Sequence, residues 1–595
     1  MASTAVAPKK PGPAGHPERT EDSPPGRSRR ARLLELGIAL VVIGCPLAFN
    51  RMSATPFADP KVVVLLAGCL CIWLGRPSFE RRIAMAAAAW VAALAIAAWF
   101  GVDRWISAAG SDNLPNGLLV LAPCAFLLAI GTRLPLRVIE RMPLWLFATS
   151  IAVAAVAIVY RFAPSEVGTI APGVPLDGST LGHPVFLAGM AAIGAIAAIE
   201  VAGSARSRWF ALAGVVVVTS ALSISTKRAG LVAVAIGLIV AWLRARHSAD
   251  PQRRSRVRIV AAVVVATTIV WMIVAPLAPA SQPVSGVTRF DELATDSARA
   301  RVVITEVLLR ASVDRPALGW GPGNTGSAYL ANASAQDIQL AGRGVPDAHD
   351  LVVESLVTSG VVGVLTFLGL LVVMALAIRR AWRDPRVAWA AAVALALLAF
   401  HLLQPINAAM TPLLFLTAGV AARSPGAAAE ARSAKLLSRA LAVPIVAGLV
   451  FSLLLAASST LEQVGRTYNS IWSLRLASSI APGRISPVET LALYRAEDAS
   501  AVEGAGDEAR SLVEETVARH PWATNVRFIG VHTGLLMHDP EFARMWLRRQ
   551  LDAFPVDRSW LGDDALRFAA GGDLDGSDAL PGSAHPSAST ATGSP

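Results

Sequence analysis

Long apolar runs, separated by short polar turns, fill most of the chain between residues 33 and 457. A helix needs about 20 residues to cross the hydrocarbon core of a bilayer, and each run reaches or approaches that length. Since a backbone in lipid must satisfy its own hydrogen bonds, such runs form helices. The pattern predicts an all-α polytopic membrane protein with about 12–13 transmembrane helices. The runs lie at 33–50, 60–75, 83–101, 117–132, 143–162, 184–203, 208–225, 229–243, 259–278, 360–378, 387–403, 411–422 and 441–457.

The composition agrees with a membrane protein. Hydrophobic residues make up 54% of the 595 residues and charged residues 16%. Soluble proteins carry roughly 25% charged residues, so a soluble globular enzyme is excluded. The high hydrophobicity also excludes disorder over most of the chain. The cysteines lie inside apolar runs, which indicates neither a disulfide framework nor a zinc site; they are Cys45, Cys69, Cys71 and Cys124.

The net charge of +11 lies mostly in segments between the apolar runs, so it gives no reason to expect a nucleic-acid partner. With the N-terminus in the cytoplasm, the cytoplasmic segments carry more Lys and Arg than the external turns and loop, as the positive-inside rule requires. We therefore expect a multi-pass protein of the plasma or inner membrane with an extracytoplasmic C-terminal tail. The densest basic group is Arg244, Arg246, Arg253, Arg254, Arg256 and Arg258.

The segments outside the apolar runs divide the chain further. Residues 1–32 read as a disordered basic cytoplasmic tail, and 33–457 form the transmembrane domain with one long extracytoplasmic loop at 279–350. Residues 458–570 show helical spacing and resemble a tetratricopeptide unit, whereas Gly, Ser, Asp and Pro predict disorder at 571–595. The tail is a candidate surface for recruiting an acceptor or a partner protein.

Two basic clusters on the predicted external side are candidates for binding an anion. The segment STKRAG places Lys227 and Arg228 between two apolar runs. They are either interfacial cations that snorkel to water or a phosphate clamp, for which the planar guanidinium fork is well suited. In the long loop, an amphipathic helix begins near Asp296 and carries Arg301, and a Pro- and Gly-rich turn follows Arg315. These arginines form either a solvated face or a second part of the anion site.

A third cluster contains a histidine beside carboxylates. His349 and Asp350 stand where a helix begins, with Asp347 and Glu354 close in sequence. Histidine accepts a proton near neutral pH, and a neighbouring carboxylate can hold its tautomer. The alternative is a histidine that only packs against or caps the helix.

The spacing of these clusters resembles the O-antigen ligase and O-antigen polymerase family of polytopic bacterial glycosyltransferases. That family's loop motif is His, then Asn, Ser or Gln, nine residues, Gly, two residues and a second small or polar residue. This chain has His349, Asp350, Gly360 and Gly363 in that register. Arg301 and the segment from Arg315 to the glycine turn fit the upstream motif, and STKRAG resembles the family's Ser-Arg-Gly-Gly helix start. The chain departs from the family pattern at Asp350, at Thr305 where tryptophan is usual, and at His183 where asparagine is usual.

The resemblance implies a fold, a reaction and site residues. The donor would be a glycan linked to undecaprenyl diphosphate or a similar polyprenyl diphosphate, and the acceptor a hydroxyl of a glycan, lipid or protein. His349, Arg228 and Arg301 would be catalytic, with His349 as the base and the arginines clamping the diphosphate. We expect an inverting transfer that needs neither a metal nor another cofactor. The residues that would bind substrate are Arg315, Lys227, Asp350, Gly360 and Gly363.

Two other functions also fit a polytopic chain with external charges. A multi-pass transporter or flippase for a glycolipid or anionic substrate would use the arginines as substrate sites, but such proteins often show pseudo-symmetric halves and charges at mid-membrane. Here the ionisable residues gather near one face, and no halves are evident. A non-catalytic scaffold would leave the motif matches unexplained.

Overall fold

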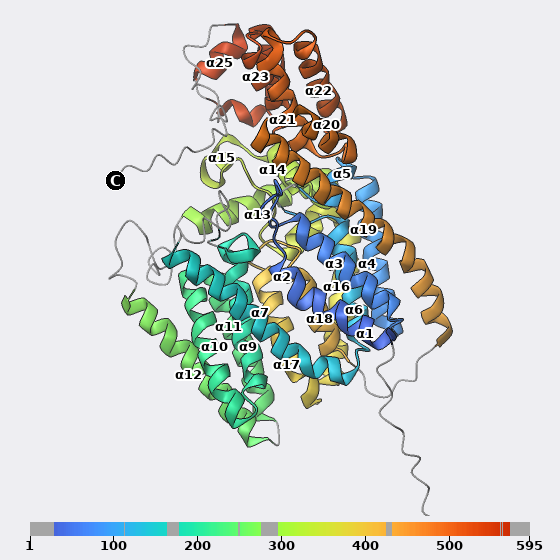
Figure 1. Ribbon diagram of the computed structural model, residues 1–595, viewed down its shortest axis with the longest axis vertical. Coiled ribbons are helices and arrows are strands. Elements are labelled where there is room, and N and C mark those ends of the chain that lie inside the picture. The colour runs from blue at the N-terminus through green and yellow to red at the C-terminus, as the bar shows by residue number, and fades with distance from the viewer. Residues whose placement is uncertain are drawn as a thin grey trace, which may run out of the picture.

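The computed structural model describes residues 29–571 apart from 112–113, 164–175, 177, 226, 248–249, 275–295, 383, 424–430, 560 and 562. Throughout this part of the chain the regular structure is helical, and no strand occurs in it. Figure 1 shows a helical bundle with a smaller helical unit on one end. The prediction of an all-α polytopic membrane protein is confirmed.

Each predicted apolar run contains a helix of the bundle. By length and composition, eight described helices could cross a membrane: α4, α7, α9, α10, α11, α12, α16 and α19. The remaining runs form shorter helices. The bundle consists of α1 (Arg29–Ala39) continued by η1 (Leu40–Gly44) and α2 (Cys45–Leu47), α3 (Asp59–Leu74), α4 (Arg81–Trp99), α6 (Leu118–Gly131), α7 (Leu136–Phe162), α9 (Pro184–Val201), α10 (Ala205–Ile224), α11 (Arg228–Arg246), α12 (Pro251–Val274), α16 (Leu351–Ala381), α17 (Ala388–His401), α18 (Met410–Ala421) and α19 (Ala431–Tyr468).

Helix α18, of 12 residues, runs between the two ends of the bundle. Just before it, Asn407 lines a cavity between the bundle and the tail. Just after it, Arg423 Nη1 lies 3.9 Å from Asp384 Oδ2, in a turn that Arg244 also contacts at the far end of the bundle. All residues of α18 are buried, so it passes through the protein interior rather than through lipid.

The end of α11 and the start of α12, which carry six arginines and are here called the arginine-rich turn, lie at the end of the bundle opposite the tail. Arg253 pairs with Glu200 near the end of α9, and the Arg244 guanidinium lies over the Trp382 ring at 4.4 Å. Since α11 begins beside the cavity on the tail side and ends in this turn, its two ends are chemically distinct. One end faces the cavity, and the other carries much of the chain's basic charge.

The described part of the long loop, residues 296–350, packs between the bundle and the tail. It contains α13 (Asp296–Asp314), α14 (Thr325–Asn332) and α15 (Ala335–Ala341). The amphipathic helix predicted to begin near Asp296 is α13, and it buries Ile304, Val307 and Leu308 in a separate apolar cluster. Phe554 of the tail joins the same cluster, so the loop and the tail share one core.

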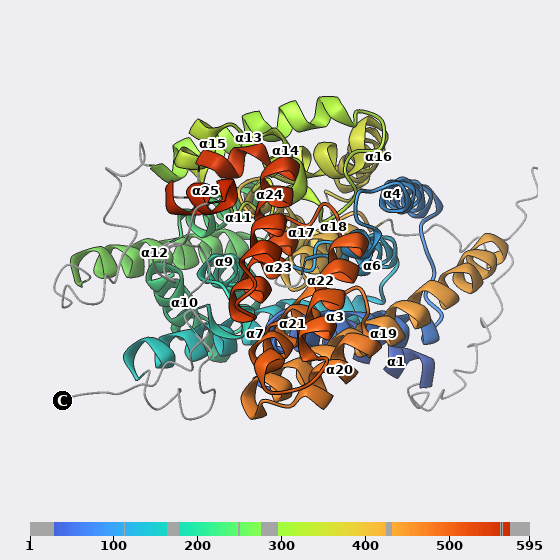
Figure 2. The same ribbon diagram turned by 90° about the horizontal axis from the view of Figure 1, so that it is seen from above.

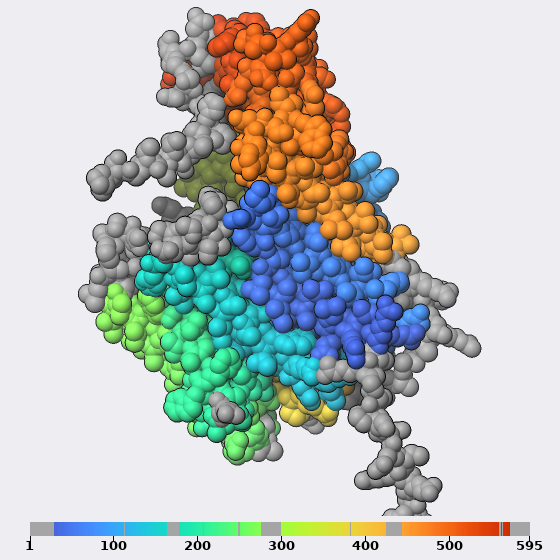
Figure 3. Space-filling view, in the orientation of Figure 1, coloured from blue at the N-terminus to red at the C-terminus, as the bar shows by residue number. Residues whose placement is uncertain are grey.

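The tail is an extension of the bundle rather than a module on a linker. Helix α19 runs without a break across the predicted boundary at 457/458, and Ser53 and Ser459 hydroxyls hydrogen-bond at 2.6 Å. In Figure 3 the surface of α19 continues directly from that of the N-terminal helices. Beyond it, Figures 1 and 2 show the tail helices over the end of the bundle: α20 (Ile471–Ile480), α21 (Ile485–Glu497), α22 (Ala505–Arg519), α23 (Val526–Leu536), α24 (Pro540–Ala553) and α25 (Asp563–Ala570).

The segments predicted to be disordered fall largely outside the described residues. Residues 1–28 and 572–595 are not described. Residues 275–295, which include the end of the predicted apolar run 259–278 and the start of the long loop, are not described either. Helix α1 begins at Arg29, so the last residues of the predicted N-terminal tail are helical.

Candidate functional site

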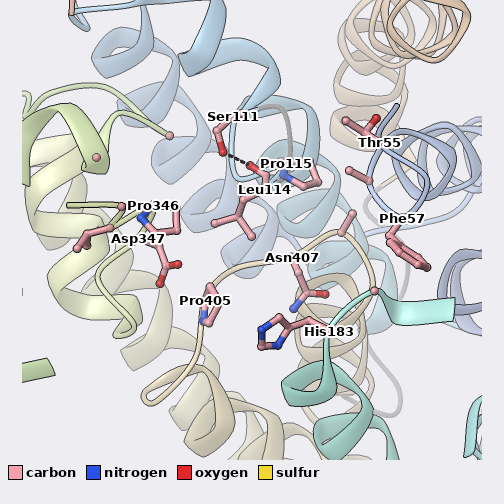
Figure 4. Close-up of a pocket in the computed structure, with 18 of the residues that line it drawn as sticks. Thr55, Phe57, Ser111, Leu114, Pro115, His183, Pro346, Asp347, Pro405 and Asn407 are labelled. Atoms are coloured by element: carbon pink, nitrogen blue, oxygen red, sulfur yellow. Dashed lines mark hydrogen bonds between the residues drawn. The ribbon is translucent and has the colours of Figure 1, made fainter. Parts of the chain in front are cut away.

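A cavity of about 1660 Å³ lies between the end of the bundle and the tail. Its walls come from the starts of α3, α9 and α11, from the segment between α17 and α18, from residues 105–111 and 114–115, from the long loop and from the tail. Figure 4 shows Asp347 on one side of this space and Asn407 and His183 next to each other on the other side. All three clusters predicted from the sequence contribute side chains to the cavity: Lys227 and Arg228, Arg301, and His349.

The cationic part of the cavity is built from helix starts and the loop. Lys227 is the N-cap residue of α11 and Arg228 its first residue, and both are half-buried. Arg301 comes from the first turns of α13, where burial lowers the pKa of its guanidinium and the nearby Asp347 opposes that change. Segments far apart in sequence thus bring three cations to one cavity, which can hold an anionic group such as a diphosphate.

His349 is held beside a buried carboxylate, which is Asp347 rather than Asp350. The His349 backbone N–H donates to Asp347 Oδ1 at 2.7 Å, and the ring Nδ1 lies 3.3 Å from the same oxygen. Burial raises the pKa of Asp347, and the neighbouring His349 and Arg301 oppose the rise. The Nδ1 atom is buried while 31% of the side chain remains exposed in the cavity. Nδ1 itself forms no hydrogen bond, so the ring of His349 and the carboxylate of Asp347 interact through their proximity alone.

The turn that presents His349 is fixed by its backbone. His349 has a φ of +51°, a left-handed conformation that histidine adopts more readily than most side chains. Buried Glu354, one turn into α16, accepts hydrogen bonds from the Ala348 N–H at 2.9 Å and from the Thr325 hydroxyl at 2.7 Å. The carboxylate of Glu354 therefore ties α14, the His349 turn and α16 together.

Helix α16 is interrupted at Gly360, and the backbone of the loop's glycine turn hydrogen-bonds to the backbone of α16 on both sides of the interruption. Gly360 has φ +63° and ψ −166°, which ends the helical hydrogen bonding there. Backbone N–H groups of Trp320 and Gly321 donate to the carbonyls of Val357 and Thr358 at 2.8 and 2.9 Å. In return, the Val361 and Val362 N–H groups donate to Pro316 and Ala317. The Leu-Gly-x-Gly turn thus satisfies the backbone groups that the break exposes.

Replacing Gly360 with alanine should disrupt this junction. An L side chain is strained at φ +63°, and its Cβ would lie 2.4 Å from the Ala317 backbone. Strain and overpacking together should cost about 2–6 kcal/mol. We expect a lower unfolding temperature of the purified protein in detergent. Gly369→Ala is the matched control, because a Cβ at position 369 of the same helix meets nothing within 4 Å; equal stability of the two variants would contradict this role.

Four residues predicted to bind substrate do not line the cavity. The Arg315 guanidinium lies over the Trp320 ring at 5.2 Å, and Asp350 caps α16 by accepting the Val352 and Val353 N–H groups. Gly360 forms the helix break, and Gly363 makes room for the buried Ser359 side chain. These contacts are structural, so we do not carry a substrate-binding role for these four residues into the proposed function.

Several cavity residues were missed by sequence reasoning. Lys61 is 3% exposed, and its Nζ donates to the carbonyls of Ala48 and Thr180. It follows a proline at the start of α3, where a lysine gives no distinct signal. Arg343 lines the cavity but pairs with Asp557 of the tail. His183 caps α9 through Nδ1, which accepts the Val185 N–H at 3.2 Å.

The described residues contain no group of three or more His, Cys, Asp or Glu side chains arranged to hold a metal ion. The chemistry that the cavity residues themselves offer is binding of an anion and transfer of a proton at His349.

The comparisons with known proteins agree with the motif reading. Residues 213–368 match the family described as O-Antigen ligase. The match spans about a quarter of the chain and contains every site residue predicted from the sequence, from Lys227 to Gly363. A search of curated proteins found no match.

Proposed function

We propose that this chain, in which residues 213–368 belong to the O-antigen ligase family, transfers a glycan from a polyprenyl diphosphate such as undecaprenyl diphosphate to an acceptor hydroxyl. One observation carries the proposal. The cations Lys227, Arg228 and Arg301 share one cavity with His349, although they come from separate segments. Such a cavity offers both charge for a diphosphate leaving group and a base for the attacking hydroxyl.

The reaction would be a single displacement at the anomeric carbon. The acceptor hydroxyl attacks that carbon, a new C–O bond forms, and the bond to the diphosphate oxygen breaks. His349 Nε2 takes the hydroxyl proton and later passes it to solvent, while Asp347 orients the ring. Arg228 and Arg301 stabilise the negative charge that grows on the departing lipid diphosphate. A single displacement inverts the anomeric configuration.

The charge at the two ends of the bundle supports an orientation for the protein. The arginine-rich turn between α11 and α12 lies opposite the cavity. Under the positive-inside rule that end faces the cytoplasm. The cavity, the long loop and the tail would then be extracytoplasmic, and the N-terminus cytoplasmic.

A transporter or flippase remains the alternative, and the cavity argues against it. Its lining residues come from one end of the bundle, the loop and the tail, and it does not include the arginine-rich end. Transporters bind their substrates near the bilayer midplane, whereas this cavity lies at one end of the bundle. The deciding experiment places the purified protein in vesicles with undecaprenyl-diphosphate-linked glycan. Release of free undecaprenyl diphosphate supports a transferase, whereas glycolipid crossing the vesicle without release supports a flippase.

The same assay tests independence from metals. The cavity supplies its own fixed cations for the leaving group, so transfer should persist at an unchanged rate after exhaustive chelation. Measuring release of the lipid diphosphate with and without chelator checks this. Loss of activity that only a divalent cation restores would contradict the proposed role of the arginines.

A further inference from the structure

The tail forms one wall of the cavity. Arg466 at the end of α19 and Ser486 and Glu489 at the start of α21 line it, together with residues 523–526 before and at the start of α23. These residues lie outside the segment that matches the O-antigen ligase family. A substrate in the cavity would therefore contact the tail as well as the bundle.

Buried polar contacts fix this wall in place. His520 Nδ1 lies 2.5 Å from Asp103 Oδ2 of the loop after α4, and both side chains are 2% exposed. Arg484 pairs with Asp59 at 2.8 Å at the start of α3. The Ser327 hydroxyl donates to the Trp522 carbonyl at 2.7 Å. Separating a buried ion pair leaves its charges buried without a partner, which strongly destabilises a protein. We therefore expect the tail to stay docked on the bundle.

The wall made by the tail differs chemically from the cationic wall. Arg466 pairs with buried Glu462 at 2.7 Å and donates to the Ser486 hydroxyl at 3.0 Å, so its charge is largely balanced. Glu489 and Asp347 are the two acidic residues among the described residues that line the cavity. Asp347 lies beside His349, whereas Glu489 belongs to the wall made by the tail. Hydroxyl, carboxylate and guanidinium groups side by side suit a ligand with many neutral hydroxyl groups.

An aromatic surface adjoins this wall. Trp105, in α5 (Arg104–Ala109), lines the cavity and is half-buried. Its indole lies against Gly483 of the tail so closely that a Cβ there would be 2.0 Å from Trp105 Cδ2. A partly exposed indole offers an apolar face for the C–H side of a sugar ring.

The cavity is large enough for two substrates. Pockets for one small ligand usually measure about 300–1,000 Å³, and this one measures about 1660 Å³. A donor bound at the cationic wall therefore leaves room for an acceptor at the tail wall.

We propose that Trp105, Arg466, Ser486 and Glu489 form a carbohydrate subsite that binds the acceptor, which is itself a glycan, and turns its hydroxyl toward His349. The inference rests on the proposed function and names the acceptor class for the same cavity. A glycan acceptor favours chain extension over transfer to a protein.

The test measures binding, so it does not depend on catalysis. The probe is the oligosaccharide that mild acid releases from the polyprenyl-linked glycans of the source cells, labelled at its reducing end. The full-length protein is held in nanodiscs, and binding of undecaprenyl diphosphate is measured in parallel. Glu489→Ala should weaken oligosaccharide binding about 10-fold or more and leave lipid binding unchanged. Glu514→Ala, an exposed α22 residue away from the cavity, should change neither.

Three results would overturn the subsite. They are no binding of the oligosaccharide by the wild type, equal binding by wild type and Glu489→Ala, or an equal loss of lipid binding in Glu489→Ala. Trp105→Phe provides a second variant, which keeps an aromatic ring against Gly483 and should weaken oligosaccharide binding less than Glu489→Ala. Failure of the proposed function appears separately, as absence of His349-dependent release of undecaprenyl diphosphate.

Discussion

His349→Asn should lower the rate of glycan transfer by about 100- to 10,000-fold, the usual contribution of a positioned general base. Asparagine tolerates the φ of +51° at this position, so the turn should survive the change. Its amide cannot accept the hydroxyl proton near neutral pH. Release of free undecaprenyl diphosphate by the protein in nanodiscs measures the effect, and His349→Ala should give the same loss.

Two controls separate a base from a structural residue. Binding of undecaprenyl diphosphate should be unchanged in His349→Asn, because the donor is held mainly by the cations. Asp347→Asn removes the carboxylate 3.3 Å from the ring Nδ1. Its loss should lower the rate of transfer and leave binding of undecaprenyl diphosphate unchanged, because Asp347 would act only through the ring of His349. Full turnover in His349→Asn would remove the base assignment.

Arg228→Ala should reduce both the affinity for undecaprenyl diphosphate and the rate of transfer. The guanidinium contacts charge that is already present on the bound donor, and this charge grows as the glycosidic bond breaks. Loss of one charge-assisted contact should raise the donor Kd about 10-fold and lower kcat/KM about 100-fold or more. Arg301→Ala should behave in the same way, since both arginines line the cavity.

Arg315→Ala is the matched control for the cation variants. It removes an arginine of the same family motif, but Arg315 lies over Trp320 rather than in the cavity. We expect its donor Kd to match that of the wild type. If Arg315→Ala weakens donor binding as much as Arg228→Ala does, an arginine outside the cavity would matter as much as one inside it. That result would contradict binding of the diphosphate in the cavity.

Much of the fold can be predicted from the sequence, because a chain in lipid must satisfy its backbone hydrogen bonds internally. Apolar runs therefore form helices. Every predicted apolar run contains a helix, and the amphipathic helix of the loop begins at Asp296 as expected. The spacing also identified Arg228, Arg301 and His349, which share the cavity. Helical periodicity and a known motif are local signals in the sequence. They are enough to predict site residues that lie at or near the start of a helix.

Two departures from the family pattern have a local explanation that spacing alone did not reveal. Asp350 stands where Asn, Ser or Gln is usual, and it caps α16 through two backbone N–H groups. His183 stands where asparagine is usual, and it caps α9. Aspartate serves as an N-cap as well as asparagine or serine does. In this chain both positions therefore serve as helix caps.

Contacts between distant segments could not be predicted from one sequence. The carboxylate beside the His349 ring is Asp347, whose Oδ1 also accepts the His349 backbone N–H in a turn at positive φ. Lys61 reaches the cavity only after α3 packs in the bundle. The tail closes the cavity through pairs such as His520 with Asp103, more than 400 residues apart in sequence. Local periodicity carries no information about such pairs.

An experimental structure of the protein in nanodiscs with undecaprenyl-diphosphate-linked glycan would test the central claim most directly. The account predicts the diphosphate in the cavity between Arg228 and Arg301, with the anomeric carbon near His349 Nε2. A donor whose diphosphate lies outside this cavity, at the arginine-rich end or on the lipid-facing surface, would contradict it.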